Sequence, residues 1–275
     1  DCATPIEFTL DDLEVKEPEP EVLLGFLAEM EFRTLTKKIA DQFGATAPVI
    51  DDTPAAADVP MVMEDVPFAP ETYECVRTLE QLSAWIAHAK ERGYVAVDTE
   101  TTSLNEMRAE LVGISLCIEA GQACYIPLQH KDGQSDDLFG TSALAEGQLS
   151  LEQVLNALKP VLADPAVIKI GQNMKYDAKI FARYGVDVAP IDDTMLISYA
   201  LHGGLHGHGM DALSARYLSH EPIPIKSLLG AGKSAITFDQ VAIEDATKYA
   251  AEDADVTLRL WQLLKPRLHK VKVTR

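Results

Sequence analysis

The chain has 275 residues, 47% of them hydrophobic and 24% charged, and its formal net charge at pH 7 is −19. This length allows one sizeable domain with an appendage. The acidic charge argues against a protein that coats nucleic acid with a basic surface, but it allows an enzyme that takes one strand end into an acidic, metal-filled pocket. No apolar run approaches the length of a membrane span, and no signal peptide is visible.

The two ends and the cysteines indicate the kind of protein. The sequence begins with Asp1 rather than Met and ends in Val271–Arg275, so we expect a piece of a longer protein. Cys117 and Cys124 stand in apolar, strand-like runs, which favours reduced core thiols, as in a cytosolic protein. The spacing of the cysteines does not fit a metal site, because they stand at positions 2, 75, 117 and 124.

Residues 1–43 form the first of three predicted parts. They begin with a strand-like run at 6–10, and helical spacing of apolar residues predicts helices over 21–30 and 32–39. This part is too small for a core of its own, so we expect it to be the end of a preceding domain.

Residues 44–71 form the second part, a linker. They contain five prolines, and every charged residue among them is acidic. This composition predicts a stiff, extended and mobile chain. Val59–Met63 and Val66–Phe68 are apolar enough to dock, but the composition favours a free linker. The main domain is predicted over 72–270.

Within the main domain, capping boxes at Thr78–Gln81 and Ser150–Gln153 predict two helix starts, and Gly93 predicts a helix end. Strands are expected over 94–97, 111–118, 123–128 and 167–170, with a turn at 119–122 and a polar loop over 131–148. Helices are expected over 78–92, 150–163, from 173 onward, and over 193–201, 210–218 and 244–268. This order predicts a mixed α/β sheet with helices on its faces.

Two carboxylates follow the buried strand 94–97. Asp98 and Glu100 are two residues apart, and this spacing on a strand places both side chains on one face. Two neighbouring anions at the edge of a core are unfavourable unless a cation joins them. A hard divalent cation such as Mg²⁺ prefers oxygen ligands of this kind. The alternative is a strand that runs into a solvated acidic turn.

Two later stretches place polar groups one helical turn apart. Asn173 and Asp177 share a face of a helix that follows a strand, and Tyr249 and Asp253 share a face of a long helix. By itself, the first pair is also typical of an Asn N-cap followed by a surface Asp.

Other acidic residues nearby have plainer interpretations. Asp193 is predicted to be a helix N-cap, and Asp192 its solvated neighbour. Glu252 and Asp255 are expected on a solvated acidic helix face.

The selected groups fit the needs of phosphodiester hydrolysis. That reaction requires a nucleophile made from water and stabilisation of the leaving oxygen, and a pair of divalent ions supplies both. A hydroxyl such as that of Tyr249 can orient the water without acting as the main base, since its ordinary pKa is near 10. The carboxylates available as ligands are Asp98, Glu100, Asp177 and Asp253.

The three motifs, in this order, resemble those of the DEDD 3′→5′ exonucleases of the Tyr subtype. The motifs are Asp98-Thr99-Glu100, then Asn173 to Asp177, then Tyr249 to Asp253. The resemblance implies a ribonuclease-H-like α/β fold: a mixed sheet flanked by helices, here with a small, mainly helical N-terminal appendage.

The longer strings Gly171–Asp177 and Tyr249–Thr257 resemble the proofreading domains of bacterial DNA polymerase I, and the likeness covers about 72–268. On this resemblance, residues 1–43 are the C-terminal tail of a 5′-nuclease domain. The implied function is removal of 3′-terminal nucleotides as 5′-monophosphates. No polymerase portion is included, so incorporation of nucleotides is not expected.

The resemblance also implies roles for individual residues. Asp98, Glu100 and Asp253 would hold the tighter of two metal ions, and Asp98 and Asp177 the second. Tyr249 would position the nucleophile. The ions would be Mg²⁺ or Mn²⁺, with Zn²⁺ a candidate at the tighter site. The substrate-binding residues would be Leu104, Gln172, Asn173 and Lys175.

The implied partners are the 3′ end of single-stranded DNA and the polymerase domain of the same full-length chain. We expect a monomer in the cytoplasm, associated with the nucleoid and not with a membrane. Two alternatives remain open, a 3′ exoribonuclease of the same superfamily and a non-catalytic spacer or DNA-end-binding module.

Two further motifs are given structural interpretations. The loop that carries His202, His206 and His208 is interpreted as a polar rim loop rather than a metal site, since no second ligand-rich stretch pairs with it. Gly230–Ser234 lacks the full spacing and the preceding strand of a phosphate loop. Lys226 and Lys233 are candidates for contact with the DNA backbone.

Overall fold

The computed structural model describes residues 17–30, 32–48, 66–136, 142–232, 235–271 and 273. It separates into two compact units, 1–56 and 57–275. The strand expected at 6–10 and the apolar segment 59–63 lie outside the described residues. Among the helices that are described, none has the length and apolar character needed to span a membrane.

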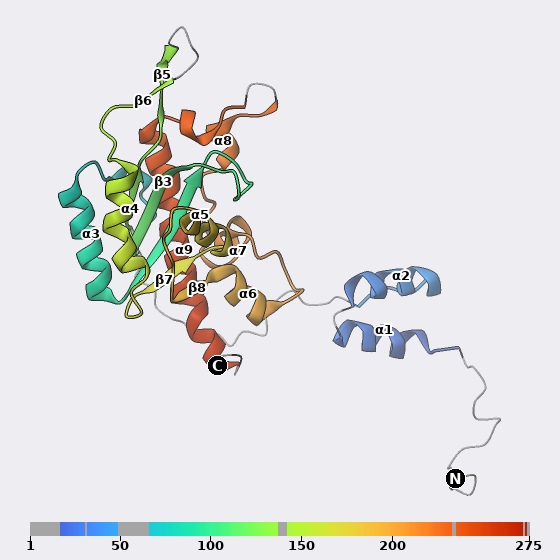
Figure 1. Cartoon of the computed structure of the whole chain (residues 1–275). Coiled ribbons are helices and arrows are strands. Elements are labelled where there is room, and N and C mark those ends of the chain that lie inside the picture. The colour runs from blue at the N-terminus through green and yellow to red at the C-terminus, as the bar shows by residue number, and fades with distance from the viewer. Residues whose placement is uncertain are drawn as a thin grey trace, which may run out of the picture. The chain divides into compact units, whose positions relative to one another are not determined.

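The first unit is a pair of helices (Figure 1). Helix α1 is Pro20–Glu29 and helix α2 is Arg33–Phe43. Leu24, Leu27 and Ala40 are buried in this unit. The two predicted helices are therefore confirmed, and α2 ends four residues later than expected.

The second unit is built on a six-stranded mixed sheet with the order β1-β4-β3-β2-β7-β8. Strand β2 pairs antiparallel with β3 and parallel with β7, so it lies inside the sheet. The strands are β1 Glu74–Cys75, β2 Tyr94–Thr101, β3 Leu111–Glu119, β4 Gln122–Pro127, β7 Ile168–Gly171 and β8 Ile191–Asp193.

Helices cover both faces of this sheet, with α3 and α4 on one side and α9 on the other (Figure 1). The helices of the second unit are α3 Leu79–Arg92, α4 Leu151–Leu162, α5 Lys175–Arg183, α6 Thr194–His202, α7 Met210–Tyr217, α8 Ile225–Leu229 and α9 Ile243–Lys270, with 3₁₀ turns at Pro70–Thr72 and Phe238–Gln240.

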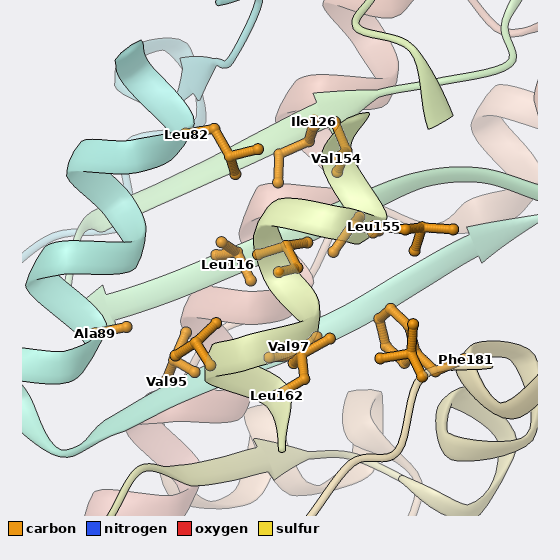
Figure 2. Close-up of a cluster of buried hydrophobic side chains, with 14 of the residues drawn as sticks. Leu82, Ala89, Val95, Val97, Leu116, Ile126, Val154, Leu155, Leu162 and Phe181 are labelled. Atoms are coloured by element: carbon orange, nitrogen blue, oxygen red, sulfur yellow. The ribbon is translucent and has the colours of Figure 1, made fainter. Parts of the chain in front are cut away.

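The alternation of side chains along β2 decides which core each residue joins. Val95 and Val97 pack with α3 and α4 in the cluster drawn in Figure 2. Ala96 points the other way, into a cluster with Ala251 and Ala254 of α9. Because these facing residues are small, α9 approaches the sheet closely at this point.

Several local predictions need correction. A two-stranded ribbon, β5 Lys131–Asp136 with β6 Ser142–Leu144, replaces part of the polar loop predicted over 131–148. A two-stranded ribbon is held together by backbone hydrogen bonds and does not need an apolar face. This segment is mostly polar, so it lacks the alternation of apolar and polar residues that would have predicted strands. Helix α8 was not predicted. Ser150 precedes α4 as expected, but its side chain makes no capping hydrogen bond within the described residues.

The end of the predicted linker is docked rather than free. The Phe68 ring stacks on His220 with centroids 3.6 Å apart, and the Arg259 guanidinium lies 4.0 Å from the Phe68 centroid. Arg259 also donates a 2.5 Å hydrogen bond to the carbonyl of Val66. The free-linker prediction is therefore wrong for 66–68, because its binding partners come from distant elements that composition does not reveal.

The acidic residues expected on the solvated face of α9 are buried. Asp255 accepts hydrogen bonds from Arg259 at 2.8 and 3.0 Å and from the Tyr73 hydroxyl at 2.8 Å. Glu252 accepts from His220 Nε2 at 3.0 Å and from the backbone N–H of Ile223 at 2.6 Å. A buried carboxylate is stable where such donors surround it, and these donors come from three separate segments of the chain.

Cys117 and Cys124 are buried and free, as predicted.

Candidate active site

Three carboxylates meet where β2 faces α9. Asp98 and Glu100 have the same parity as Ala96, so they lie on the α9 side of the sheet, and Asp253 reaches them from α9. One oxygen from each of the three lies within 4.8 Å of the others. Within the described residues, no other group of three acidic, histidine or cysteine side chains places its ligand atoms this close.

Asp177 joins the site from the first turn of α5. Its Oδ1 accepts hydrogen bonds from the backbone N–H of Thr99 at 3.1 Å and from the Thr99 hydroxyl at 2.6 Å. Asp177 lies close enough to the other carboxylates that its charge raises the pKa of Asp98 and of Glu100. Asp177 is 3% exposed.

Burial and mutual repulsion dominate the electrostatics of this cluster. Burial raises the pKa values of Asp98, Glu100 and Asp253 well above their usual range, and the charges of neighbouring carboxylates raise each pKa further. Burial also raises the pKa of Asp177 to about 7, although hydrogen bonds from Thr99 oppose this shift. Four carboxyl groups that resist ionisation in the absence of a cation, three of them buried and Asp98 partly buried, fit a hard divalent ion. Such an ion would remove the repulsion between them.

Tyr249 lies one turn before Asp253 on α9. Its ring contacts Phe238 with centroids 6.0 Å apart. Burial raises the pKa of the Tyr249 hydroxyl, and the charges of Asp253, Glu100 and Asp98 raise it further. The phenol is therefore neutral at physiological pH and can donate a hydrogen bond.

A family model described as 3'-5' exonuclease matches residues 73–269 of this chain. The chain belongs to this 3'-5' exonuclease family. The match includes every element that carries the acidic cluster, and it confirms the family expected from the three motifs.

Similar whole proteins point to the same family. The chain is 40% identical to "DNA polymerase I" of Rhizobium leguminosarum, over 98% of this chain and 33% of that protein. It is 36% identical to "DNA polymerase I" of Pseudomonas aeruginosa, over 97% of this chain and 27% of that protein. The exonuclease chain thus spans a third or less of the length of these relatives.

Solved structures show the fold. The exonuclease chain is similar to Brucella melitensis NrnC at 21% identity and a TM-score of 0.50, over 74% of this chain and 82% of that one. It is also similar to the POL domain of Pol1 from M. smegmatis, solved with DNA primer-template and dNTP, at 20% identity and a TM-score of 0.50, over 72% and 28% of the two chains. The ribonuclease-H-like mixed sheet flanked by helices is confirmed.

The exonuclease domain exposes the first predicted substrate residue. Leu104 is 94% exposed in the loop after β2. Tyr176, the residue before Asp177, holds this loop, because its hydroxyl donates to the Ser103 carbonyl at 2.6 Å and lies 2.6 Å from Thr101 Oγ1. The loop with Leu104 is therefore attached to the helix that carries Asp177.

The other predicted substrate residues lie in or near the turn from β7 to α5. Asn173 has a left-handed backbone with φ 64° and lies outside α5, so the prediction that it shares a helical face with Asp177 is wrong. Lys175 is exposed, and its ammonium group contacts the Asn173 side chain. Gln172 donates to the His208 carbonyl at 2.8 Å and accepts from Thr194, so both ends of its amide contact the protein.

Three residues beside the site were not predicted to support it. Thr99 binds Asp177, and Tyr176 binds the loop that carries Leu104. Of the two, Thr99 could have been identified from strand alternation, which places its side chain on the face of β2 opposite to that of Asp98. Asp193 is confirmed as the N-cap of α6, but it also binds the Asn173 turn. Asp192 is not solvated as predicted, since it accepts hydrogen bonds from Trp261 at 2.7 Å and from Lys265 at 2.7 Å.

The histidines of the α6–α7 loop contact one another without forming a close ligand set. The His206 ring lies 5.6 Å from that of His202 and 5.0 Å from that of His208. His208 Nδ1 lies 2.8 Å from Ser198 Oγ. Residues 230–232 follow helix α8, whereas a phosphate loop follows a strand, so the structure agrees with the prediction that this segment is not a phosphate loop. Lys233 lies outside the described residues.

Proposed function

We propose that the chain hydrolyses the 3′-terminal phosphodiester of single-stranded or mispaired DNA and releases 5′-mononucleotides, the proofreading reaction of a DNA polymerase. The observation that supports this proposal is the meeting of Asp98, Glu100 and Asp253, with Asp177 beside them, in a family of 3'-5' exonucleases.

The acidic cluster is proposed to bind two divalent ions. Asp98, Glu100 and Asp253 would hold one, and Asp98 and Asp177 the other. Mg²⁺ or Mn²⁺ is proposed, with Zn²⁺ as a candidate for the first position, because hard oxygen donors suit these ions. When bound, such ions supply a water-derived nucleophile and stabilise the leaving oxygen.

The protein groups around the cluster are proposed to position the substrate. The hydroxyl of Tyr249 orients the attacking water by a hydrogen bond. Its raised pKa keeps it protonated, so it does not act as the base that removes the proton of this water. Leu104 and Asn173 contact the terminal nucleotide, and the exposed ammonium of Lys175 contacts the strand. Gln172 contributes indirectly, because its amide already joins β7 to the His208 loop.

The wider setting is also a proposal. With a net charge of −19, the chain binds a strand end weakly and with strong salt dependence, and the polymerase domain of the full-length protein provides the main contact with DNA. Residues 1–43 end a 5′-nuclease domain, 44–71 link it, and 72–270 form the exonuclease domain. The protein is a monomer that works in the bacterial cytoplasm, at the nucleoid, where its substrate lies.

End-labelled single-stranded DNA tests the proposal. We expect progressive shortening and 5′-mononucleotide products with Mg²⁺ or Mn²⁺, and none with chelator or with Asp98→Ala. Full-length substrate that persists at ample enzyme with both metals contradicts the proposal. An RNA of the same sequence, tested in parallel, separates a deoxyribonuclease from an exoribonuclease, and calorimetric titration without Mn²⁺ binding would favour the non-catalytic module.

A further inference from the structure

One carboxylate closes two turns at the same edge of the sheet. Asp193 ends β8 and is in register with Gly171, the last residue of the neighbouring strand β7, and the two strands lie side by side in Figure 1. Asp193 Oδ1 accepts hydrogen bonds from the backbone N–H groups of Met195 at 2.9 Å and Leu196 at 3.4 Å, which caps α6. The Asp193 side chain therefore fulfils its predicted local role.

The same carboxylate also reaches the turn from β7 to α5. Its Oδ1 accepts from the N–H of Asn173 at 3.0 Å, and its Oδ2 accepts from the N–H of Met174 at 3.0 Å. Asp193 is 6% exposed, so these bonds form away from solvent. One buried side chain thus accepts hydrogen bonds from four backbone N–H groups, two in its own turn and two in a turn about 20 positions earlier in the chain.

The β7–α5 turn needs this external support. Asn173 adopts φ 64°, a left-handed conformation that is unfavourable for most residues other than glycine. The first N–H groups of a helix have no partner inside it, and the N-cap residue of α5 is Met174, whose side chain makes no capping bond in the described structure. Asp193, from another element, binds the N–H of this N-cap residue and that of Asn173 before it.

The position of the start of α5 matters for the site, because Asp177 lies in its first turn. Thr99 holds the Asp177 carboxylate from the β2 side, and Asp193 holds the turn that precedes it. We propose that Asp193 is a positioning residue of the exonuclease site, which aligns Asn173 for the substrate and Asp177 for its metal ion. This inference rests on the proposed function.

The competing explanation is that Asp193 only caps α6, and Asp193→Ser separates the two. Serine caps helices about as well as aspartate. Its single, shorter hydroxyl can serve α6 but cannot also reach Asn173 and Met174. Thr78→Ala is the matched control, because Thr78 caps α3 through the backbone N–H of Gln81, and its loss lowers stability without removing a contact of the site.

The experiment compares the two variants with the unchanged chain in melting temperature, in kcat and KM on single-stranded DNA, and in Mn²⁺ binding by calorimetry. For Asp193→Ser we expect kcat to fall by ~10–100-fold, as is typical when a group that orients a metal ligand is lost. We also expect the more weakly bound Mn²⁺ ion to be lost while the more tightly bound one remains. Thr78→Ala should retain both kcat and the two ions. If the serine variant does not fold, Asp193→Asn, which keeps one acceptor oxygen, makes the same comparison.

Unchanged kcat and unchanged Mn²⁺ binding in Asp193→Ser would overturn the inference while the proposed function stands. If the protein without substitutions digests no DNA, the proposed function is overturned instead. The Mn²⁺ titration then still decides the role of Asp193, since loss of one ion supports it and equal binding contradicts it.

Discussion

The hydroxyl of Thr99 donates a 2.6 Å hydrogen bond to Oδ1 of Asp177, a residue 78 positions later in the chain. Thr99 stands between two acidic residues of β2 whose side chains point to the opposite face. The strand therefore presents Asp98 and Glu100 to α9 and holds Asp177 of α5 with the residue between them. This single strand therefore carries or binds three of the four carboxylates, and α9 supplies the fourth, Asp253.

Thr99→Val tests this relationship. Valine keeps the shape and removes the hydroxyl bond, so the pKa of Asp177, already raised to about 7, rises further. We expect ~10-fold lower activity at pH 7, with partial recovery at higher pH, measured as kcat/KM against pH. Thr99→Ser, which retains the hydroxyl, is the control. An unchanged pH profile in the valine variant would show that this bond does not tune Asp177.

The metal-free protein should lose stability as pH rises. The folded-state pKa of each clustered carboxyl lies above its ordinary value near 4, so the folded state binds more protons than the unfolded state, and stability falls with increasing pH. For Asp177 the window runs from about pH 4 to about pH 7. Melting curves in chelator should shift down across it, and saturating Mn²⁺ should remove most of the shift.

Asp177→Asn provides the matched comparison for that prediction, because it removes one titrating group at nearly constant size. Its melting temperature in chelator should depend less on pH than that of the unchanged chain. Identical slopes for the two proteins would be inconsistent with the raised pKa of Asp177.

Removal of the docked segment should destabilise the exonuclease domain. Phe68 lies between His220 and Arg259, so Phe68→Ala should lower the free energy of unfolding by about 1–3 kcal/mol. Urea denaturation measures this change, and Phe68→Leu should recover only part of it. A chain that starts at Val66 should be as stable as one that also includes the linker, whereas a chain that starts at Thr72 should not.

Lys169 should be important for stability despite its charge. It is buried, and its ammonium donates to the carbonyls of Val167 and Ala189 at 2.6 Å and of Asp164 at 2.9 Å. Lys169→Met removes the ammonium donor from all three carbonyls, and that of Asp164 keeps only the backbone N–H of Val167 at 3.2 Å. We therefore expect a loss of more than ~2 kcal/mol in urea denaturation. An exposed lysine, Lys159, changed to Met is the control. If Lys169→Met lowers the free energy of unfolding by less than Lys159→Met does, water has taken the place of the ammonium as the donor to these carbonyls.

The sequence by itself identified the central strand, the helices that follow it except α8, and the three motifs, because each depends on the periodicity of one element. The two-residue spacing of Asp98 and Glu100 set their common face before any partner was known. The one-turn spacing of Tyr249 and Asp253 did the same on α9. Family membership followed from the order of these motifs.

Only the tertiary structure decided which other polar residues are buried and what they bind. Glu252, Asp255 and Asp192 have the local pattern of a solvated surface, yet His220, Arg259 and Lys265 respectively bind them. Asp193 has the pattern of an ordinary cap, yet it supports a second helix. Local spacing determines the direction of a side chain within its own element, whereas the stability of a buried charge depends on donors that folding brings from elsewhere in the chain.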